Sequence, residues 1–135
     1  MISAFALTLA MMAQDGGFPT DRETLSQYMV QSCIVQQVAN QGGAPADYVA
    51  SCSCLDEEIG SNTSDLVYRA IALGSQGAIG EDAQVEDSAA ALSEAERLIA
   101  TAPEAERLAL PGILQSGLMA CMADMPADNS AQGGE

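Results

Sequence analysis

Four cysteines constrain this chain more than any other feature, because their spacing indicates which segments lie side by side. Cys33 and Cys52 stand at equal distances in sequence from Gly42-Gly43, where a helical hairpin can turn. In that hairpin the two sulfurs face each other, whereas Cys54 points about 200° away around its helix. The spacing therefore predicts the disulfides Cys33–Cys52 and Cys54–Cys121. The alternative is Cys33–Cys54 with Cys52–Cys121, which moves the centre of the hairpin by only about one residue.

The periodicity of apolar residues predicts an all-α fold, a small bundle of five to six helices that opens with an αα-hairpin. Alternating β-branched residues, which would indicate strands, are absent. Thr20 and Glu23 have the spacing of a capping box at the start of the first helix. A Gly-rich acidic loop is expected at 74–87, and Pro111-Gly112 should break the chain. The helices are expected at about 20–41, 45–60, 64–73, 88–100, 101–110 and 112–125.

Residues at helical spacing predict which side chains point into the core and which form pairs on the surface. Charged residues one helical turn apart predict exposed local ion pairs, which are Glu94–Arg97, Glu104–Arg107 and Asp65–Arg69. A second capping box is expected from Thr101 to Glu104. The expected inner stripes are Tyr48, Cys52, Leu55 and Ile59, then Leu92, Ala95, Ile99 and Ala102, and finally Leu114, Leu118, Cys121 and Met125.

Residues 1–13 predict a secretory signal peptide. Residues 2–13 carry no charge and end in small side chains. As a helix they would span about 18 Å, against a hydrocarbon core of about 30 Å. Cleavage is expected after Ala13, or else after Ala10. No basic residue precedes the apolar run, as would follow if a misplaced start codon omitted the basic n-region of the signal. The alternative interpretation is an N-terminal core helix.

The remaining chain divides into three parts. We expect a flexible mature N-terminus at 14–19, a single helical domain at 20–125 and a disordered tail at 126–135. The signal predicts a periplasmic or secreted protein, and oxidising compartments of that kind favour disulfides. No segment after the signal is apolar enough to predict a membrane span.

The charged residues exclude several functions. The chain has 19 acidic residues and four basic ones, all arginine, and its net charge is -15. Without histidine or lysine it has no Ser-His-Asp triad, no imidazole metal ligand and no Schiff base. Nucleic acid is not an expected partner, because binding to phosphates requires basic side chains. No cofactor motif is present, so the sequence predicts no cofactor and no enzymatic activity.

The expected function is therefore non-enzymatic. The sequence predicts a disulfide-stabilised, exported component that binds an unidentified protein or has a structural role in the cell envelope. Met119, Met122 and Met125 offer an alternative, because thioethers at three-residue spacing suit Cu(I). Packing in the core is the other role open to these methionines.

Cys52 and Cys54 predict a third function, that of a thiol-disulfide oxidoreductase. A Cys-x-Cys pair can act as a redox-active dithiol when a nearby cation or helix N-terminus lowers the thiol pKa. The acidic residues 56–58 follow this pair directly, which disfavours the thiolate. The function therefore stays an alternative to the structural role of these cysteines.

Overall fold

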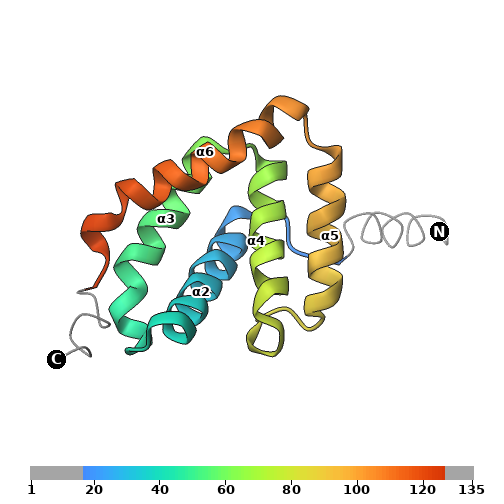
Figure 1. The fold of residues 1–135 in the computed structure, drawn as a ribbon. Helices are drawn as coiled ribbons and strands as arrows, with labels where there is room; N and C mark the ends of the chain where they lie inside the picture. Colours follow the sequence, from blue (N-terminus) through green and yellow to red (C-terminus); the bar gives the residue numbers. More distant parts are fainter. Residues whose placement is uncertain (1–16, 127–135) are drawn as a thin grey trace.

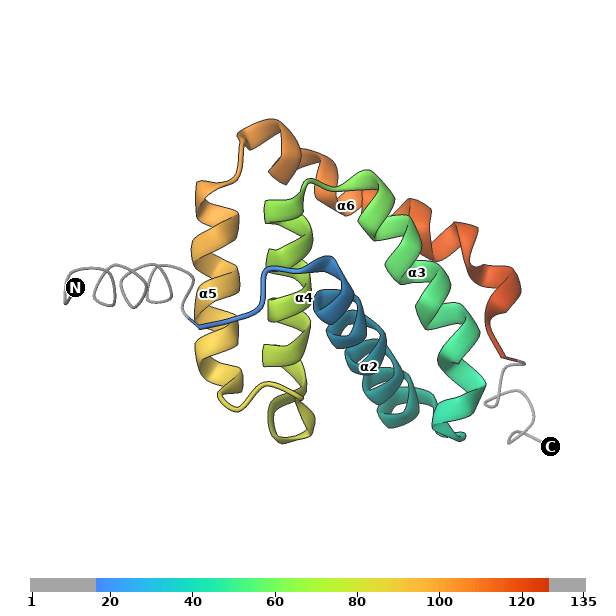
Figure 2. The same cartoon turned by 180° about the vertical axis from the view of Figure 1, so that it is seen from behind.

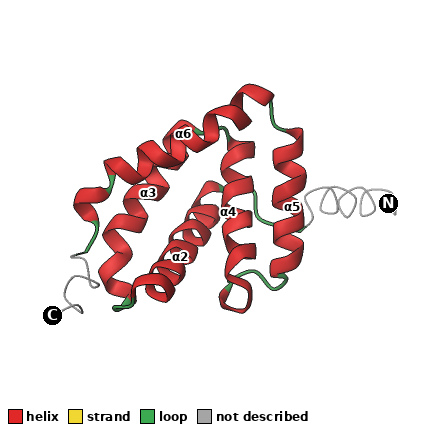
Figure 3. Cartoon of the chain, viewed as in Figure 1, coloured by secondary structure: helices red, strands yellow, loops and turns green. Residues whose placement is uncertain are grey.

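The computed structural model describes residues 17–126, and within this range the chain forms helices and no strands (Figure 3). The predicted all-α fold is confirmed, with five α-helices in this range. The elements, in chain order, are α2 (Arg22–Gln41), η1 (Pro45–Tyr48), α3 (Val49–Asn62), α4 (Asp65–Ile79), η2 (Gly80–Asp82), α5 (Ser88–Thr101), α6 (Glu104–Ala120) and η3 (Met122–Asp124), where η denotes a 3-10 helix.

The helices form two hairpins that a last helix crosses. α2 and α3 make the first hairpin, and α4 and α5 make the second (Figure 1). α4 packs against both α2 and α5. α6 begins beside the end of α5 and then runs along α3, which joins the second hairpin to the first (Figures 1 and 2). The core lies where these helices meet and includes Leu25, Met29, Ile59, Tyr68, Leu73 and Leu98.

The turn of the first hairpin lies at the predicted diglycine. Gly42 and Gly43 have φ angles of 75° and 86°, in the left-handed region that glycine adopts without a steric penalty. The N–H of Gly42 donates to the carbonyl of Val38 and closes α2. The Tyr48 hydroxyl donates to the Gly42 carbonyl at 2.5 Å, so the returning chain is fixed to the turn.

The start of α2 differs from the predicted capping box. Asp21, and not Thr20, is the N-cap, and its carboxylate accepts hydrogen bonds from the backbone N–H and the hydroxyl of Thr24. A carboxylate at this position also interacts favourably with the helix dipole. The predicted capping box of Thr20 and Glu23 is therefore wrong, because the N-cap of α2 lies one residue later, at Asp21.

α4 continues six residues beyond its predicted end and replaces the first part of the loop expected at 74–87. Gly74 and Gly77 lie inside the helix, where they allow α5 to approach closely. A Cβ atom on Gly77 would lie only 2.7 Å from the Cβ of Leu92. These glycines are contact positions and not helix breakers, which the sequence pattern alone does not distinguish.

α6 is one helix where the sequence predicts two. Pro111 lies inside it on the exposed side, and the predicted break at Pro111-Gly112 is wrong. The second predicted capping box is also wrong, because Pro103 is the N-cap and makes no side-chain cap. The Thr101 hydroxyl donates to the Leu98 carbonyl at the end of α5 instead.

The predicted inner stripes are confirmed for the hairpin and only partly for the later helices. Tyr48, Cys52 and Ile59 are buried as expected. On α5 the buried residues are Ala91, Ala95, Leu98 and Ala102, whereas Leu92 is 42% exposed. On α6 and after it, Cys121 is buried but Leu118 is 55% exposed. Both corrections show that the exposed face of a helix depends on its packing partners.

The packed domain begins before its predicted start at Thr20. Phe18 packs against the core, and Arg69 donates to the carbonyls of Phe18 and Pro19. The predicted signal peptide at 1–13 lies outside the described residues, as do 14–16 of the expected flexible segment and 127–135 of the expected tail. Within residues 17–126, no helix is both long enough and apolar enough to cross a membrane.

Candidate functional site

The cysteines form the two favoured disulfides. Cys33–Cys52 joins α2 to the start of α3, and Cys54–Cys121 joins α3 to the residue that follows α6, with Cα–Cα distances of 5.7 and 5.8 Å. The predicted pairing is confirmed, because residues two apart on α3 do point to different neighbours. None of the four cysteines is free, and Cys52 and Cys54 belong to different bonds. The structure therefore does not present them as one dithiol pair.

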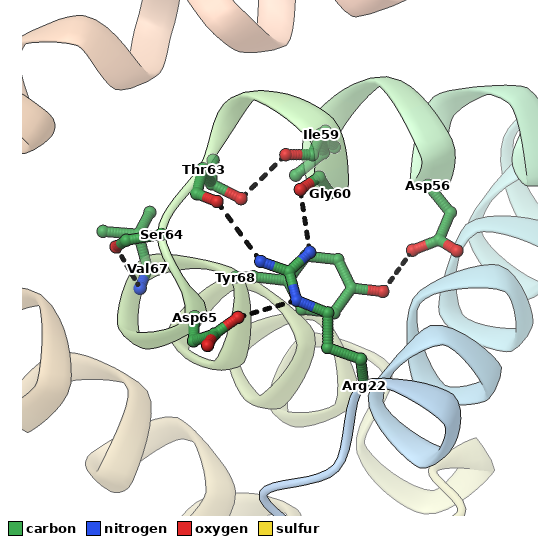
Figure 4. A network of polar contacts seen from close by, with 9 residues as sticks. All are labelled: Arg22, Asp56, Ile59, Gly60, Thr63, Ser64, Asp65, Val67 and Tyr68. Atoms are coloured by element: carbon green, nitrogen blue, oxygen red, sulfur yellow. Dashed lines mark hydrogen bonds and ion pairs between the residues drawn. The ribbon is translucent and has the colours of Figure 1, made fainter.

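Arg22 holds the C-terminal end of α3. Its guanidinium donates to the carbonyls of Gly60 and Thr63 at 2.7 and 3.3 Å (Figure 4). It also forms an ion pair with Asp65 at 2.8 Å. The carbonyl end of a helix attracts cations, so this arginine stabilises the junction of α3 and α4 from α2. The predicted partner of Asp65 was Arg69, and that pair is wrong.

Tyr68 separates Arg22 from Asp56. The guanidinium lies 4.5 Å from the centre of the Tyr68 ring, a cation–π distance. The Tyr68 hydroxyl donates to Asp56 at 2.6 Å, and the Ser26 hydroxyl donates to the other oxygen of that carboxylate (Figure 4). Burial and the neighbouring carboxylate raise the pKa of Tyr68 well above its ordinary value, so the hydroxyl stays a donor.

A fully buried glutamine joins α4 to α2 and to the loop before α5. The Gln76 amide group donates to the Ser32 hydroxyl and to the Gln31 side chain at 2.7 and 2.6 Å. Its carbonyl accepts the N–H groups of Gln84 and Val85. Every polar atom of this side chain has a partner, which is the condition for burying an amide without penalty. Its role is therefore structural.

Arg69 and Glu94 form the most enclosed ion pair of the described residues. Their side chains are 9% and 11% exposed, and the charged groups lie 3.5 Å apart between α4 and α5. Arg97 donates a further hydrogen bond to Glu94, as the local spacing predicts. This bond, assisted by the charge of Arg69, lowers the pKa of Glu94. The predicted pair Glu104–Arg107 does not form within the described range.

Most of α6 and the residues that follow it form an uncharged segment. Residues 108–123 contain no Asp, Glu or Arg, although the whole chain has 19 acidic residues. We define the α6 face as the side chains of Leu108, Leu118, Met119 and Met122, which are 74%, 55%, 65% and 67% exposed. The charge-free run was visible in the sequence, but its pattern alone predicted an inward stripe, because the packing of α6 was not known.

A second apolar surface lies on the outer side of α2. It encloses about 560 Å³ and is lined by Val30, Ile34, Val35 and Pro45 with the polar Ser26, Gln27 and Gln31. Val30, Ile34 and Val35 are half-buried and Pro45 is exposed, whereas all four side chains of the α6 face are mostly exposed. The α6 face therefore leaves more apolar surface in contact with water.

The three methionines proposed for Cu(I) do not share one helix. Met119 lies on α6, Met122 begins the 3-10 helix η3, and Met125 follows η3. The helix expected to extend to 125 ends at Ala120, so the register that would place the three thioethers on one surface is lost there. The described residues contain no cluster of three or more Cys, Asp or Glu side chains arranged to hold a metal. Copper binding stays a prediction.

Comparisons with known proteins give no further assignment. No protein-family model, curated protein or solved structure matches this chain. The arguments that follow rest on the residues of this chain alone.

Proposed function

We propose that this protein is a non-enzymatic, exported component that binds another protein through the α6 face. The supporting observation is the position of its exposed apolar side chains. Four of the six large apolar side chains that are exposed in the described range belong to the α6 face. Leu118, Met119 and Met122 lie within five residues of one another, and a concentration of exposed apolar side chains is typical of an interaction site.

The chemistry of the α6 face favours a partner with an apolar strip and a basic border. Methionine side chains adapt to different partner shapes, and two of the four side chains are methionines. Acidic residues outnumber basic ones at both ends of the uncharged run, with Glu104, Glu106 and Arg107 before it and Asp124 after it. Complementary basic groups would steer association, whereas a second copy with a charge of -15 would be repelled.

Export is supported by two features. The uncharged residues 2–13 have the pattern of a signal peptide. Both disulfides would be maintained in an oxidising compartment and reduced in the cytosol. A periplasmic or secreted location follows from this proposal, and the partner would be found there.

The test is capture of a partner from the exported fraction of the source cells, with the oxidised protein as bait. The double variant Met119→Glu/Met122→Glu places two charges in the α6 face and should reduce capture by at least about tenfold, since burying unpaired charges is costly. The matched control is Val49→Glu, which adds a charge to another exposed apolar position, 48% exposed and on α3. It should capture the partner as well as the unchanged protein does.

Other outcomes would contradict the proposal in distinguishable ways. Capture that survives the double variant but is lost in Ile34→Glu would place the contact on α2. Self-association that the double variant abolishes would identify a second copy as the occupant. A captured protein that all variants retain equally would owe its binding to the acidic surface in general.

A further inference from the structure

We propose that a cavity between α2, α3, α4 and α6 binds a small cationic amphiphile, an amine with a short alkyl chain or one aromatic ring. The proposal does not depend on the proposed function of the α6 face, although Leu118 belongs both to that face and to the wall of the cavity. The cavity has a volume of about 250 Å³. Its lining combines apolar side chains from four helices with Gln36, Gln37, Ser75 and the carboxylate-bearing residue Asp56.

The apolar part of the cavity sets the size of the ligand. Its walls include Met29, Leu55, Ile59, Ile71, Leu118 and the Cys33–Cys52 disulfide. An apolar protein cavity of about 150 Å³ is known to hold benzene. The larger volume here therefore suits a chain of about six to eight carbons or a ring with a short side arm. The lining residues Gln36 on α2 and Leu118 on α6 are exposed, so the cavity reaches the surface.

Asp56 determines the charge of the ligand. Its two oxygens each accept one hydroxyl, from Tyr68 and from Ser26. A carboxylate has about four acceptor positions, so acceptor capacity remains on both oxygens. Within the described residues Asp56 forms no ion pair. A half-buried carboxylate without a cation favours a ligand that carries an ammonium group.

The neighbouring arginine is committed elsewhere. Arg22 lies against the Tyr68 ring and bonds to Asp65, Gly60 and Thr63, so Tyr68 stands between it and Asp56 (Figure 4). Moving Arg22 to Asp56 would break the contacts that hold the end of α3. The two hydroxyls orient Asp56 but leave its charge unpaired, which makes an ammonium group the complementary ligand. Anionic ligands are disfavoured by Asp56 and by the net charge of -15.

The test compares three ligands with the same carbon chain. Hexylammonium, hexanol and hexanoate are titrated into the full oxidised protein by calorimetry, with NMR shifts of the side-chain methyl groups to locate binding. We expect hexylammonium to bind about tenfold more tightly than hexanol, which is the effect of one charge-assisted hydrogen bond. Hexanoate should bind most weakly. Equal affinity for the amine and the alcohol would overturn the assignment of Asp56.

Three variants separate the cavity from the acidic surface. Asp56→Asn should lower the affinity for hexylammonium about tenfold and leave that for hexanol unchanged. Glu57→Gln removes one negative charge from the exposed next residue and should change neither affinity more than about twofold. An equal loss in both variants would show attraction to the surface only and overturn the proposal.

Ser75→Leu keeps the proposal testable if Asp56→Asn does not fold. Ser75 lines the cavity, and the larger side chain should fill part of it and weaken binding of both the amine and the alcohol. Methyl shifts confined to Ile59, Ile71 and Leu55 would support binding inside the cavity. Undiminished binding in Ser75→Leu would show that the ligand lies elsewhere.

Discussion

Arg69 carries its charge into the region between α4 and α5, where it is only 8% exposed. Its guanidinium donates to the carbonyls of Phe18 and Pro19 and faces Glu94. An enclosed charge of this kind is tolerated only when it is paired and hydrogen-bonded. At the level of single residues, Arg22 and Arg69 therefore join segments that are far apart in sequence. Of the three local ion pairs that the sequence predicts, only Glu94–Arg97 forms in the described residues.

Glu94→Gln should destabilise the protein by about 3 kcal/mol at pH 7, because it removes the carboxylate that faces the enclosed guanidinium of Arg69. The hydrogen bond from Arg97 lowers the pKa of Glu94 in the folded protein. The stabilisation is therefore complete above the unfolded pKa of about 4.3 and is lost as the pH falls through the lower folded value. Urea unfolding at pH 7, 5 and 3 should show the difference between the two proteins shrinking only at the lowest pH.

Glu96→Gln is the matched control for this experiment, because Glu96 is exposed on the same helix. It should change the free energy of unfolding by less than about 0.5 kcal/mol at each pH. A difference for Glu94→Gln that stays constant from pH 7 to pH 3 would show that its carboxylate charge contributes nothing.

At the level of elements, the first hairpin was predictable and the later helix boundaries were not. Gly42-Gly43 and the positions of Cys33 and Cys52 are local signals, and they gave the turn and the pairing correctly. The end of α4 was missed because Gly77 looks like a breaker until α5 packs against it. The continuous α6 was missed because a proline on an exposed side can be accommodated by a helix held elsewhere.

The orientation of α6 also required the structure. Gly117 is buried against α3, where an added Cβ would lie 3.1 Å from Leu55. This close contact and the Cys54–Cys121 bond fix which side of α6 faces inward. The sequence stripe placed Leu118 on that side, but the structure leaves it exposed. The α6 face and the cavity beside Asp56 both depend on this packing, so neither could be predicted from periodicity.

Pro111→Ala should stabilise the protein by about 2 kcal/mol. Proline inside a helix lacks the N–H that would bond to the carbonyl four residues earlier, at a cost of about 3 kcal/mol relative to alanine. Its restriction of the unfolded chain offsets about 1 kcal/mol of that cost. Pro111 is exposed, so alanine leaves no cavity. The measurement is urea unfolding followed by far-ultraviolet circular dichroism.

Pro103→Ala is the matched control, because it replaces a proline at the end of the same helix and not in its interior. Pro103 is the N-cap of α6, where no intrahelical bond is lost. Its replacement should change stability by less than about 1 kcal/mol. A neutral or destabilising Pro111→Ala would show that the missing N–H at this position costs the folded helix nothing.

At the level of the whole molecule, acidic residues far outnumber the four arginines that could neutralise them. Within residues 17–126, ion pairs join Arg22 to Asp65 and both Arg69 and Arg97 to Glu94. The chain contains 19 acidic residues, so repulsion among the others opposes the compact state. Two disulfides limit the expansion of the unfolded chain and counteract this repulsion.

Moderate salt should therefore raise the melting temperature. At about 0.1 M salt the screening length is about 10 Å, shorter than the distance across a domain of this size. We expect the melting temperature to rise by several degrees, about 3–6 °C, between 10 and 200 mM NaCl at pH 7. Near pH 4 many carboxylates are protonated, so the rise should nearly vanish. A melting temperature that stays flat or falls with salt at pH 7 would mean that the charges are spaced too widely to repel one another in the folded state.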